Sequence, residues 1–124
     1  MKHVTIVNHS ATLISSLQAG YCASFWCRLR GLTFRSHLPL EEGLLLVQNR
    51  DNRLDSSIHM LMVWMDLGVV WINTAGEVVD TVLAKSWHPA YIPKSPARYV
   101  LEIHPNRLTE FHIGDKVTFE EALD

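Results

Sequence analysis

The sequence predicts a mainly β fold, a sandwich or barrel-like sheet of about eight short strands with one covering α-helix. Two observations predict this class. Short runs rich in β-branched and other apolar residues recur along the chain, separated by Gly, Pro, Asn and Asp. Only residues 22–29 repeat their bulky apolar positions with helical spacing. Since the chain has 124 residues, 48% of them hydrophobic, we expect a single domain over residues 1–124.

The first half of the chain is expected to contain a hairpin, the helix and a buried strand. Residues 2–7 and 12–17 are the expected strands of the hairpin. The helix that follows ends at Gly31. Its apolar stripe consists of Cys22, Phe25, Trp26 and Leu29. Residues 43–48 predict a fully buried strand, and the hydrophilic residues 48–57 predict an exposed loop.

The second half is expected to supply the remaining strands, which are residues 58–65, 67–73, 77–84, 98–103 and 116–119. Residues 73–76 suit a type I turn between two of them, because Gly76 stands at the last turn position. Residues 85–97 contain three prolines, so they predict a loop. Residues 105–111 are expected to form one helical turn.

The two cysteines are expected to be buried free thiols. Cys22 and Cys27 are five residues apart in the predicted helix. At the usual helical pitch they would lie about 140° apart around the axis, which disfavours a disulfide. Their spacing matches no zinc motif.

Charge and hydropathy narrow the classes of partner. The formal net charge is −2, so a broad basic surface for nucleic acid is not expected. The first residues lack the pattern of a signal peptide, and no run of 18 apolar residues occurs. We therefore expect a soluble cytoplasmic protein with no nucleic-acid or membrane partner.

Several segments together resemble one known family, the domain of unknown function 192 family of uncharacterised bacterial and archaeal proteins. The first is A-x(4)-R-x(2)-G-L-x(2)-R, at residues 23–35. It is followed by EGLLLV at 42–47, SIHMLM running on to GVVWIN at 57–73, ARYVLEI at 97–103, and IGD at 113–115. The resemblance implies a mainly β, sandwich-like domain with no established reaction.

The chain departs from the family pattern between two of the predicted strands. Family members tend to carry a basic residue after methionine, then a proline and an aspartate. Here Trp64 stands at the basic position and Gly68 at the aspartate position. The resemblance therefore implies that part of any polar site shared by the family is missing from this chain.

The sequence offers candidates for ligand binding, which are Arg28, Arg35, His59, Trp87 and Tyr91. Guanidinium groups recognise carboxylate or phosphate, although both arginines could instead pair with glutamates of the chain. The histidine lies in an apolar predicted strand, where it is either a hydrogen-bonded core residue or a ligand contact. The two aromatics of the proline-rich loop could stack on a sugar or a partner, or cap the sheet.

No catalytic set, metal site or cofactor is predicted. The seven histidines show no metal-ligand spacing, and the chain has no nucleophile elbow or glycine-rich phosphate loop. This favours a non-catalytic binding or interaction domain for a small ligand, glycan or protein. The alternative is an enzyme of unknown class that uses His59 with Asp66 or Glu102, near Arg28 and Arg35. A homodimer or a structural role in a complex is a third possibility.

Overall fold

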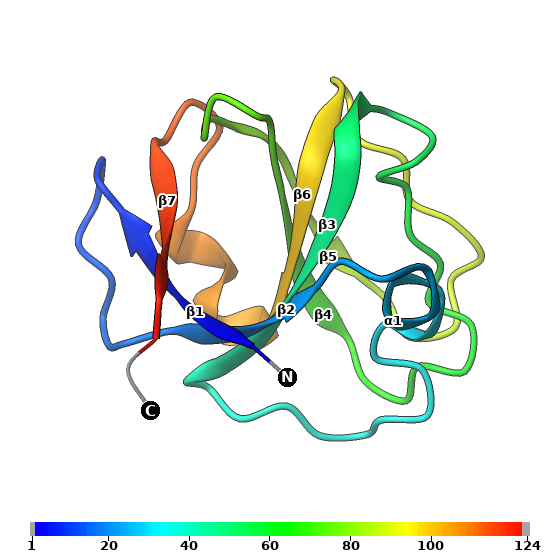
Figure 1. Ribbon diagram of the computed structural model, residues 1–124. Coiled ribbons are helices and arrows are strands. Elements are labelled where there is room, and N and C mark those ends of the chain that lie inside the picture. The colour runs from blue at the N-terminus through cyan, green and yellow to red at the C-terminus, as the bar shows by residue number, and fades with distance from the viewer. Residues whose placement is uncertain (1, 123–124) are drawn as a thin grey trace.

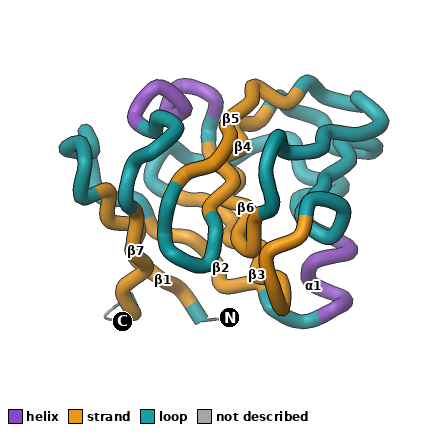
Figure 2. Tube along the Cα trace, turned by 90° about the horizontal axis from the view of Figure 1, so that it is seen from above, coloured by secondary structure: helices purple, strands orange, loops and turns teal. Residues whose placement is uncertain are grey.

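The computed structural model, which describes residues 2–122, contains one curled sheet of seven strands in the order β5-β4-β6-β3-β2-β1-β7 (Figure 1). The strands are β1 His3–Asn8, β2 Gln18–Cys22, β3 Glu42–Asn52, β4 Leu67–Ile72, β5 Val78–Ala84, β6 Ala97–Ile103 and β7 Val117–Glu121. The helices are α1 Phe25–Arg30 and the 3-10 helix η1 Pro105–Glu110, which lie on opposite sides of the sheet (Figure 2). No helix within residues 2–122 is long and apolar enough to cross a membrane.

The sheet curls into a half-barrel, which brings its two edge strands, β5 and β7, close together. Strand β2 pairs with β3 in parallel, and the other neighbouring strands are antiparallel. Next to the start of β5, Glu77 forms an isolated bridge with Lys116, which precedes β7. The amide of Val78 also donates to the carbonyl of Asp115 at 2.9 Å. The two edge strands therefore meet at one corner of the fold.

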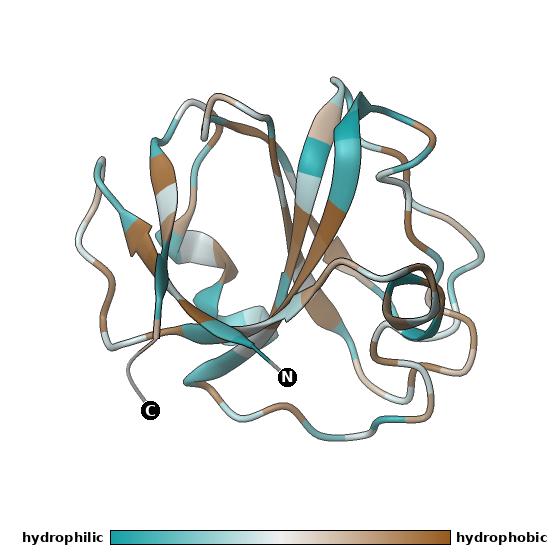
Figure 3. Cartoon of the chain, viewed as in Figure 1, coloured by the Kyte–Doolittle hydropathy of each residue, from teal (hydrophilic) through white to brown (hydrophobic). Residues whose placement is uncertain are grey.

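Each face of the sheet carries its own apolar core. Inside the curl lies a cluster to which all the strands contribute, with Leu45, Leu101 and Ile103 among its fully buried members. On the other face a second cluster, which includes Trp71, is covered by residues 32–38 and 58–63. Figure 3 shows that β3 and β6 are apolar across the middle of the sheet and hydrophilic toward one end. The central strands are therefore buried on both faces.

The mainly β class is confirmed, with seven strands where about eight were expected. Residues 58–65 do not form a strand, and only Ile58 pairs there, with Tyr91. The chain turns within this segment, where Met62 has a φ of 61°. The expected strand at residues 12–17 is a loop, because the partner of β1 begins at Gln18. Strand β3 runs on to Asn52, into the stretch expected to be a loop.

The single α-helix is confirmed, but it begins later and faces solvent. Ser24 is its N-cap, with a side-chain oxygen that accepts from the amide of Cys27 at 3.2 Å. Gly31 ends the helix as predicted, with a φ of 51° that suits glycine. The expected apolar stripe does not cover the core, because α1 buries none of its residues and Trp26 is 75% exposed.

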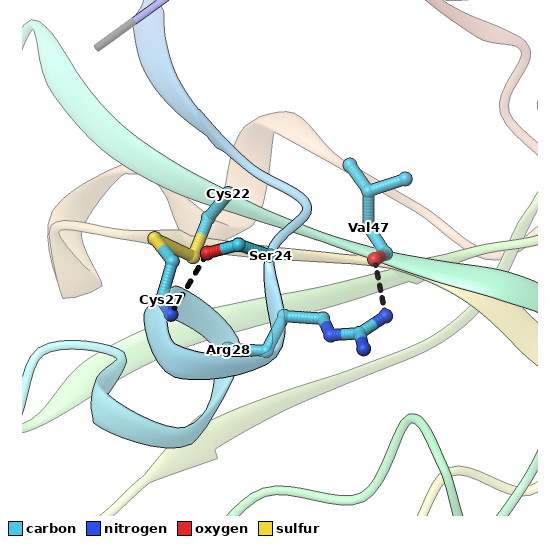
Figure 4. The surroundings of a disulfide bond; sticks show 5 residues. All are labelled: Cys22, Ser24, Cys27, Arg28 and Val47. Carbon is cyan, nitrogen blue, oxygen red and sulfur yellow. Dashed lines mark hydrogen bonds between the residues drawn. A yellow bond between two sulfur atoms is a disulfide. The ribbon is translucent and has the colours of Figure 1, made fainter.

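The expectation of free thiols is wrong, because Cys22 and Cys27 form a disulfide (Figure 4). Cys22 is the last residue of β2 and Cys27 lies in α1, so the helical spacing assumed for the pair does not apply. The strand-to-helix turn brings their Cα atoms to 5.5 Å, within bridging range. Since disulfides are more usual in oxidising compartments, the cytoplasmic location stays a prediction.

A buried ion pair joins η1 to two loops. Arg107 Nε donates to Glu110 Oε2 at 2.8 Å, and both residues are buried. The remaining guanidinium nitrogens donate to the carbonyls of Ser15, Ser16 and Leu40. The hydrogen bond from Arg107 is the main cause that lowers the pKa of Glu110, so the stabilisation from this carboxylate is lost as pH falls.

We expect Arg107→Met to lower the free energy of unfolding by roughly 3–5 kcal/mol, because the Glu110 carboxylate loses its buried partner. Urea denaturation at neutral pH measures the change. Arg50→Met is the matched control, since Arg50 and Asp55 form an exposed pair at 3.9 Å. This control should cost less than about 1 kcal/mol, and equal losses in the two variants would contradict a structural role for the buried pair.

Candidate functional site

A cleft of about 570 Å³ lies between α1, the residues that follow it, strand β3 and residues 55–63. Its walls are mixed in character. Their apolar side chains are Phe25, Leu29, Leu32, Leu46, Ile58 and Val63, and polar or charged residues supply most of the remainder. The charged or titratable residues that line it are Arg28, Arg30, Arg50, Asp55, His59 and Glu102. Apolar side chains beside polar groups that can orient a ligand are the combination found in small-molecule sites.

Glu102 is the buried polar group of this cleft. It lies on β6 directly opposite Leu44 of β3 and Val69 of β4, so apolar side chains flank it on both sides. The residue is only 4% exposed, and burial raises its pKa to about 7. Its Oε1 atom is the only buried side-chain nitrogen or oxygen within residues 2–122 that has no hydrogen-bond partner.

The unpaired oxygen faces the end of α1. A methyl group placed on Gly31 would lie 3.8 Å from Glu102 Oε1, which is the nearest atom outside residues 30–32. Gly31 itself lines the cleft, and its backbone is fixed by the bond from its amide to the carbonyl of Cys27 at 2.9 Å. The carboxyl group of Glu102 therefore lies close to Gly31 at the C-terminal end of α1.

Two of the predicted binding residues share this cleft. Arg28 reaches from α1 across to β3, where its Nη1 donates to the carbonyl of Val47 at 3.0 Å (Figure 4). His59 lines the cleft with an exposed side chain, so the core-histidine interpretation is wrong. Of the two carboxylates considered for an acid–base pair, Glu102 lines the cleft with His59, whereas Asp66 lines a different hollow.

The other three predicted residues lie elsewhere. Arg35 lines a second hollow of about 460 Å³, which shares Arg30 and Gly31 with the cleft. Tyr91 has structural contacts, since it stacks on His88 at 4.3 Å between ring centroids and its hydroxyl accepts from the amide of Lys85 at 2.9 Å. Trp87 packs edge-on against Trp64, with ring centroids 5.0 Å apart. The five residues do not converge on one site.

Glu102 is the central residue that sequence reasoning placed only in the alternative hypothesis. The segment ARYVLEI alternates charged and apolar residues, which suggested a half-buried strand with Glu102 on the exposed face. The signal in the sequence that could have placed Glu102 is its spacing of two residues from Val100. Both residues lie on the same face of β6, and Val100 packs into the core cluster that includes Trp71. Within residues 2–122, no cluster of three or more His, Cys, Asp and Glu side chains has the arrangement of a metal site.

The raised pKa of Glu102 makes the folded state hold its proton between about pH 4.5 and pH 7, where the unfolded chain has lost it. The free energy of unfolding must therefore fall as pH rises through this window. The full effect corresponds to roughly 3 kcal/mol, reached above the folded-state pKa.

We expect Glu102→Gln to remove this dependence, because the amide has the same shape and does not ionise. Urea unfolding at about pH 5 and about pH 8 should show that the variant gains on the wild type as pH rises, by up to roughly 3 kcal/mol. Glu120→Gln, at an exposed position on β7, is the control and should follow the wild type. Parallel curves for Glu102→Gln and the wild type would show that Glu102 does not titrate near neutrality.

Comparison with known sequences identifies relatives over most of the chain. The model of the DUF192 family, described as "Uncharacterized ACR", matches residues 5–119. A UPF0127 protein of Thermococcus gammatolerans is 39% identical over 99 residues, which make up 78% of this chain and 63% of that protein. A UPF0127 protein of Pyrococcus horikoshii is 31% identical over 115 residues, or 90% of this chain and 96% of that protein. The chain thus spans less than two thirds of the length of the Thermococcus relatives.

Solved structures share the fold at lower identity. A crystal structure of a protein from Sinorhizobium meliloti 1021 superposes with a TM-score of 0.82 and 17% identity, covering 95% of this chain and 92% of the other. A protein of unknown function from Novosphingobium aromaticivorans gives a TM-score of 0.79 and 22% identity, covering 94% and 83%. Since the family model covers nearly the whole chain and relatives above 30% identity align with most of it, the chain belongs to the DUF192 (UPF0127) family.

Proposed function

We propose that this protein is a non-catalytic binding domain that holds a small polar molecule in the cleft, against Glu102. The observation that carries the proposal is the buried Oε1 atom without a partner, on a residue that lines a cleft large enough for a ligand. Buried side-chain oxygens are nearly always hydrogen-bonded, and an unmade bond costs about 1–3 kcal/mol. A donor group on a ligand would supply the missing bond.

The charges of the cleft indicate what else the ligand carries. Arg28 and Arg30 both line it, and within residues 2–122 neither has a carboxylate at ion-pair distance. Asp55, the other acidic residue of the lining, already pairs with Arg50. A small molecule with a carboxylate or phosphate for an arginine and a hydroxyl or amine for Glu102 fits this pattern. Hydroxy acids, amino acids and acidic sugars belong to that class.

An enzyme that uses Glu102 and His59 is the second candidate function, and one observation favours it. The two residues line the same cleft, and burial places the pKa of Glu102 at about 7. A carboxyl group with a pKa near the working pH exchanges protons efficiently in both directions. In this alternative the ligand would be a substrate that gives a proton to one of the two side chains and receives a proton from the other.

A defined panel of small molecules tests the binding proposal: lactate, serine, glucuronate, glucose and AMP. Each is titrated into the protein and followed by amide chemical shifts. We expect an acidic member to shift residues of the cleft, Gly31 and Leu46 above all. At about pH 8, where the Glu102 carboxyl group is ionised, Glu102→Gln should weaken its binding roughly tenfold, since the amide oxygen accepts the same hydrogen bond without the negative charge. Glu120→Gln should leave the affinity unchanged.

Two outcomes decide between the alternatives. Shifts confined to residues outside the cleft, or an affinity that Glu102→Gln leaves unchanged, would contradict the binding site. Conversion of the bound compound by the wild type, lost in Glu102→Gln and His59→Asn while binding persists, would favour the enzyme over the binding domain.

A further inference from the structure

Large apolar side chains from three loops lie exposed side by side on the surface. They are Phe34, Met62, Trp64 and Trp87, with exposed fractions between 44% and 69%, and we call them the aromatic patch. Backbone hydrogen bonds connect the loops. The amide of Phe34 donates to the carbonyl of Met62 at 2.7 Å, and the amide of Trp87 donates to the carbonyl of Met60 at 2.8 Å. The rings of Trp64 and Trp87 then meet edge-on across the loops.

Three residues of this patch hold a strained backbone conformation, because each stands at the third position of a hydrogen-bonded tight turn. Phe34, Met62 and Trp87 have φ values of 69°, 61° and 66°, and no other non-glycine residue within 2–122 has a positive φ. Bulky L residues rarely adopt this conformation, whereas glycine adopts it at no steric cost. A chain under selection for stability alone would place glycine at such turns. Strain of this kind concentrates where a side chain is presented for function.

The charges beside the patch indicate the sign of its partner. Arg35 follows Phe34, and its carbonyl accepts from the amide of Trp64 at 3.1 Å, so the residue belongs to the same loop contact. Arg35 and Arg30 are exposed, and within residues 2–122 neither has a carboxylate at ion-pair distance. The nearby carboxylate of Asp66 is already held by Lys85 at 3.5 Å.

A hollow next to these arginines offers room for an anchoring side chain. Its volume is about 460 Å³, and Trp26, Leu38 and Leu44 contribute apolar lining while Arg30 and Arg35 contribute positive charge. Glu42 also lines the hollow and is its one acidic residue. Tryptophan and arginine around a pocket are the residues that dominate binding energy at protein interfaces.

We propose that the aromatic patch and Arg35 form a docking surface for a protein segment that carries apolar side chains together with aspartate or glutamate. A second copy of this chain fits less well, because it would bring Arg30 and Arg35 against their own counterparts. Rigid, hydrogen-bonded loops with fixed side-chain directions suit a partner of defined shape more than a fluid lipid surface. Neither the four patch residues nor Arg35 lines the cleft of Glu102, so the docking surface is distinct from that cleft and borders it at Arg30.

The test uses a fluorescein-labelled peptide of leucine, phenylalanine and glutamate, and a second peptide with lysine in each glutamate position. Fluorescence anisotropy should show binding of the acidic peptide and not of the basic one. Phe34→Gly and Arg35→Gln should each weaken binding roughly tenfold or more, and Ile14→Ala, at an 84% exposed position in another loop, should not. Glu102→Gln should also leave peptide binding unchanged.

Phe34→Gly also tests whether the strain serves binding. Glycine relieves the positive φ of an exposed position, so the urea midpoint of the variant should equal or exceed that of the wild type. Weaker binding with undiminished stability would support a functional role for Phe34. A variant that binds the acidic peptide as well as the wild type would overturn the proposal.

A lipid surface or a second copy of this chain could instead occupy the docking surface, and evidence for either would overturn the proposal. One is binding to vesicles of phosphatidylcholine with phosphatidylglycerol, lost in Phe34→Gly, while the acidic peptide does not bind. The other is a mass that rises with protein concentration in the wild type and stays monomeric in Phe34→Gly. Equal binding of the acidic and basic peptides would contradict the proposal that the partner is acidic and pairs with Arg35.

Discussion

The pairing of β6 with β3 on one side and β4 on the other is the constraint on which the rest of the structure depends. This register turns Leu101 and Ile103 into the core inside the curl and Val100 into the core on the opposite face. Glu102 shares the face of Val100, so a carboxyl group is held in an apolar layer where its ionisation is opposed. A hydrophobic residue would suit the fold better there. A chain that keeps a carboxyl group at such a position accepts lower stability, which is the usual mark of a functional residue.

The short helix α1 depends on very few contacts for its position, although both candidate surfaces border it. It buries no residue of its own, and it is held by the disulfide to β2, the bond from Arg28 to Val47 and the turn at Gly31 (Figure 4). The cleft of Glu102 and the hollow beside Arg35 are both lined by Arg30 and Gly31 at the end of this helix. A change in the position of α1 would therefore alter both surfaces together, which offers a physical route for coupling between them.

Much of the fold could be predicted because local patterns determine it. The β4–β5 hairpin follows from two apolar runs around a turn that ends in glycine, and the bond from the Gly76 amide to the Asn73 carbonyl has the geometry of that turn. The end of α1 at Gly31 and the helical turn at η1 are local in the same sense. The disulfide was missed because it depends on where β2 stops and α1 starts, and element boundaries are the least certain part of a sequence-based prediction.

The sequence by itself determined the class of fold, the positions of most strands along the chain and two of the residues in the cleft, Arg28 and His59. Periodicity and turn residues act over a few positions, so they are readable along the chain. The tertiary structure alone decided that residues 58–65 turn instead of pairing, that Trp26 faces solvent, and that Glu102 is buried without a partner. Each of these depends on pairing between strands far apart in sequence. The environment of a side chain is set by those non-local contacts, which no local pattern encodes.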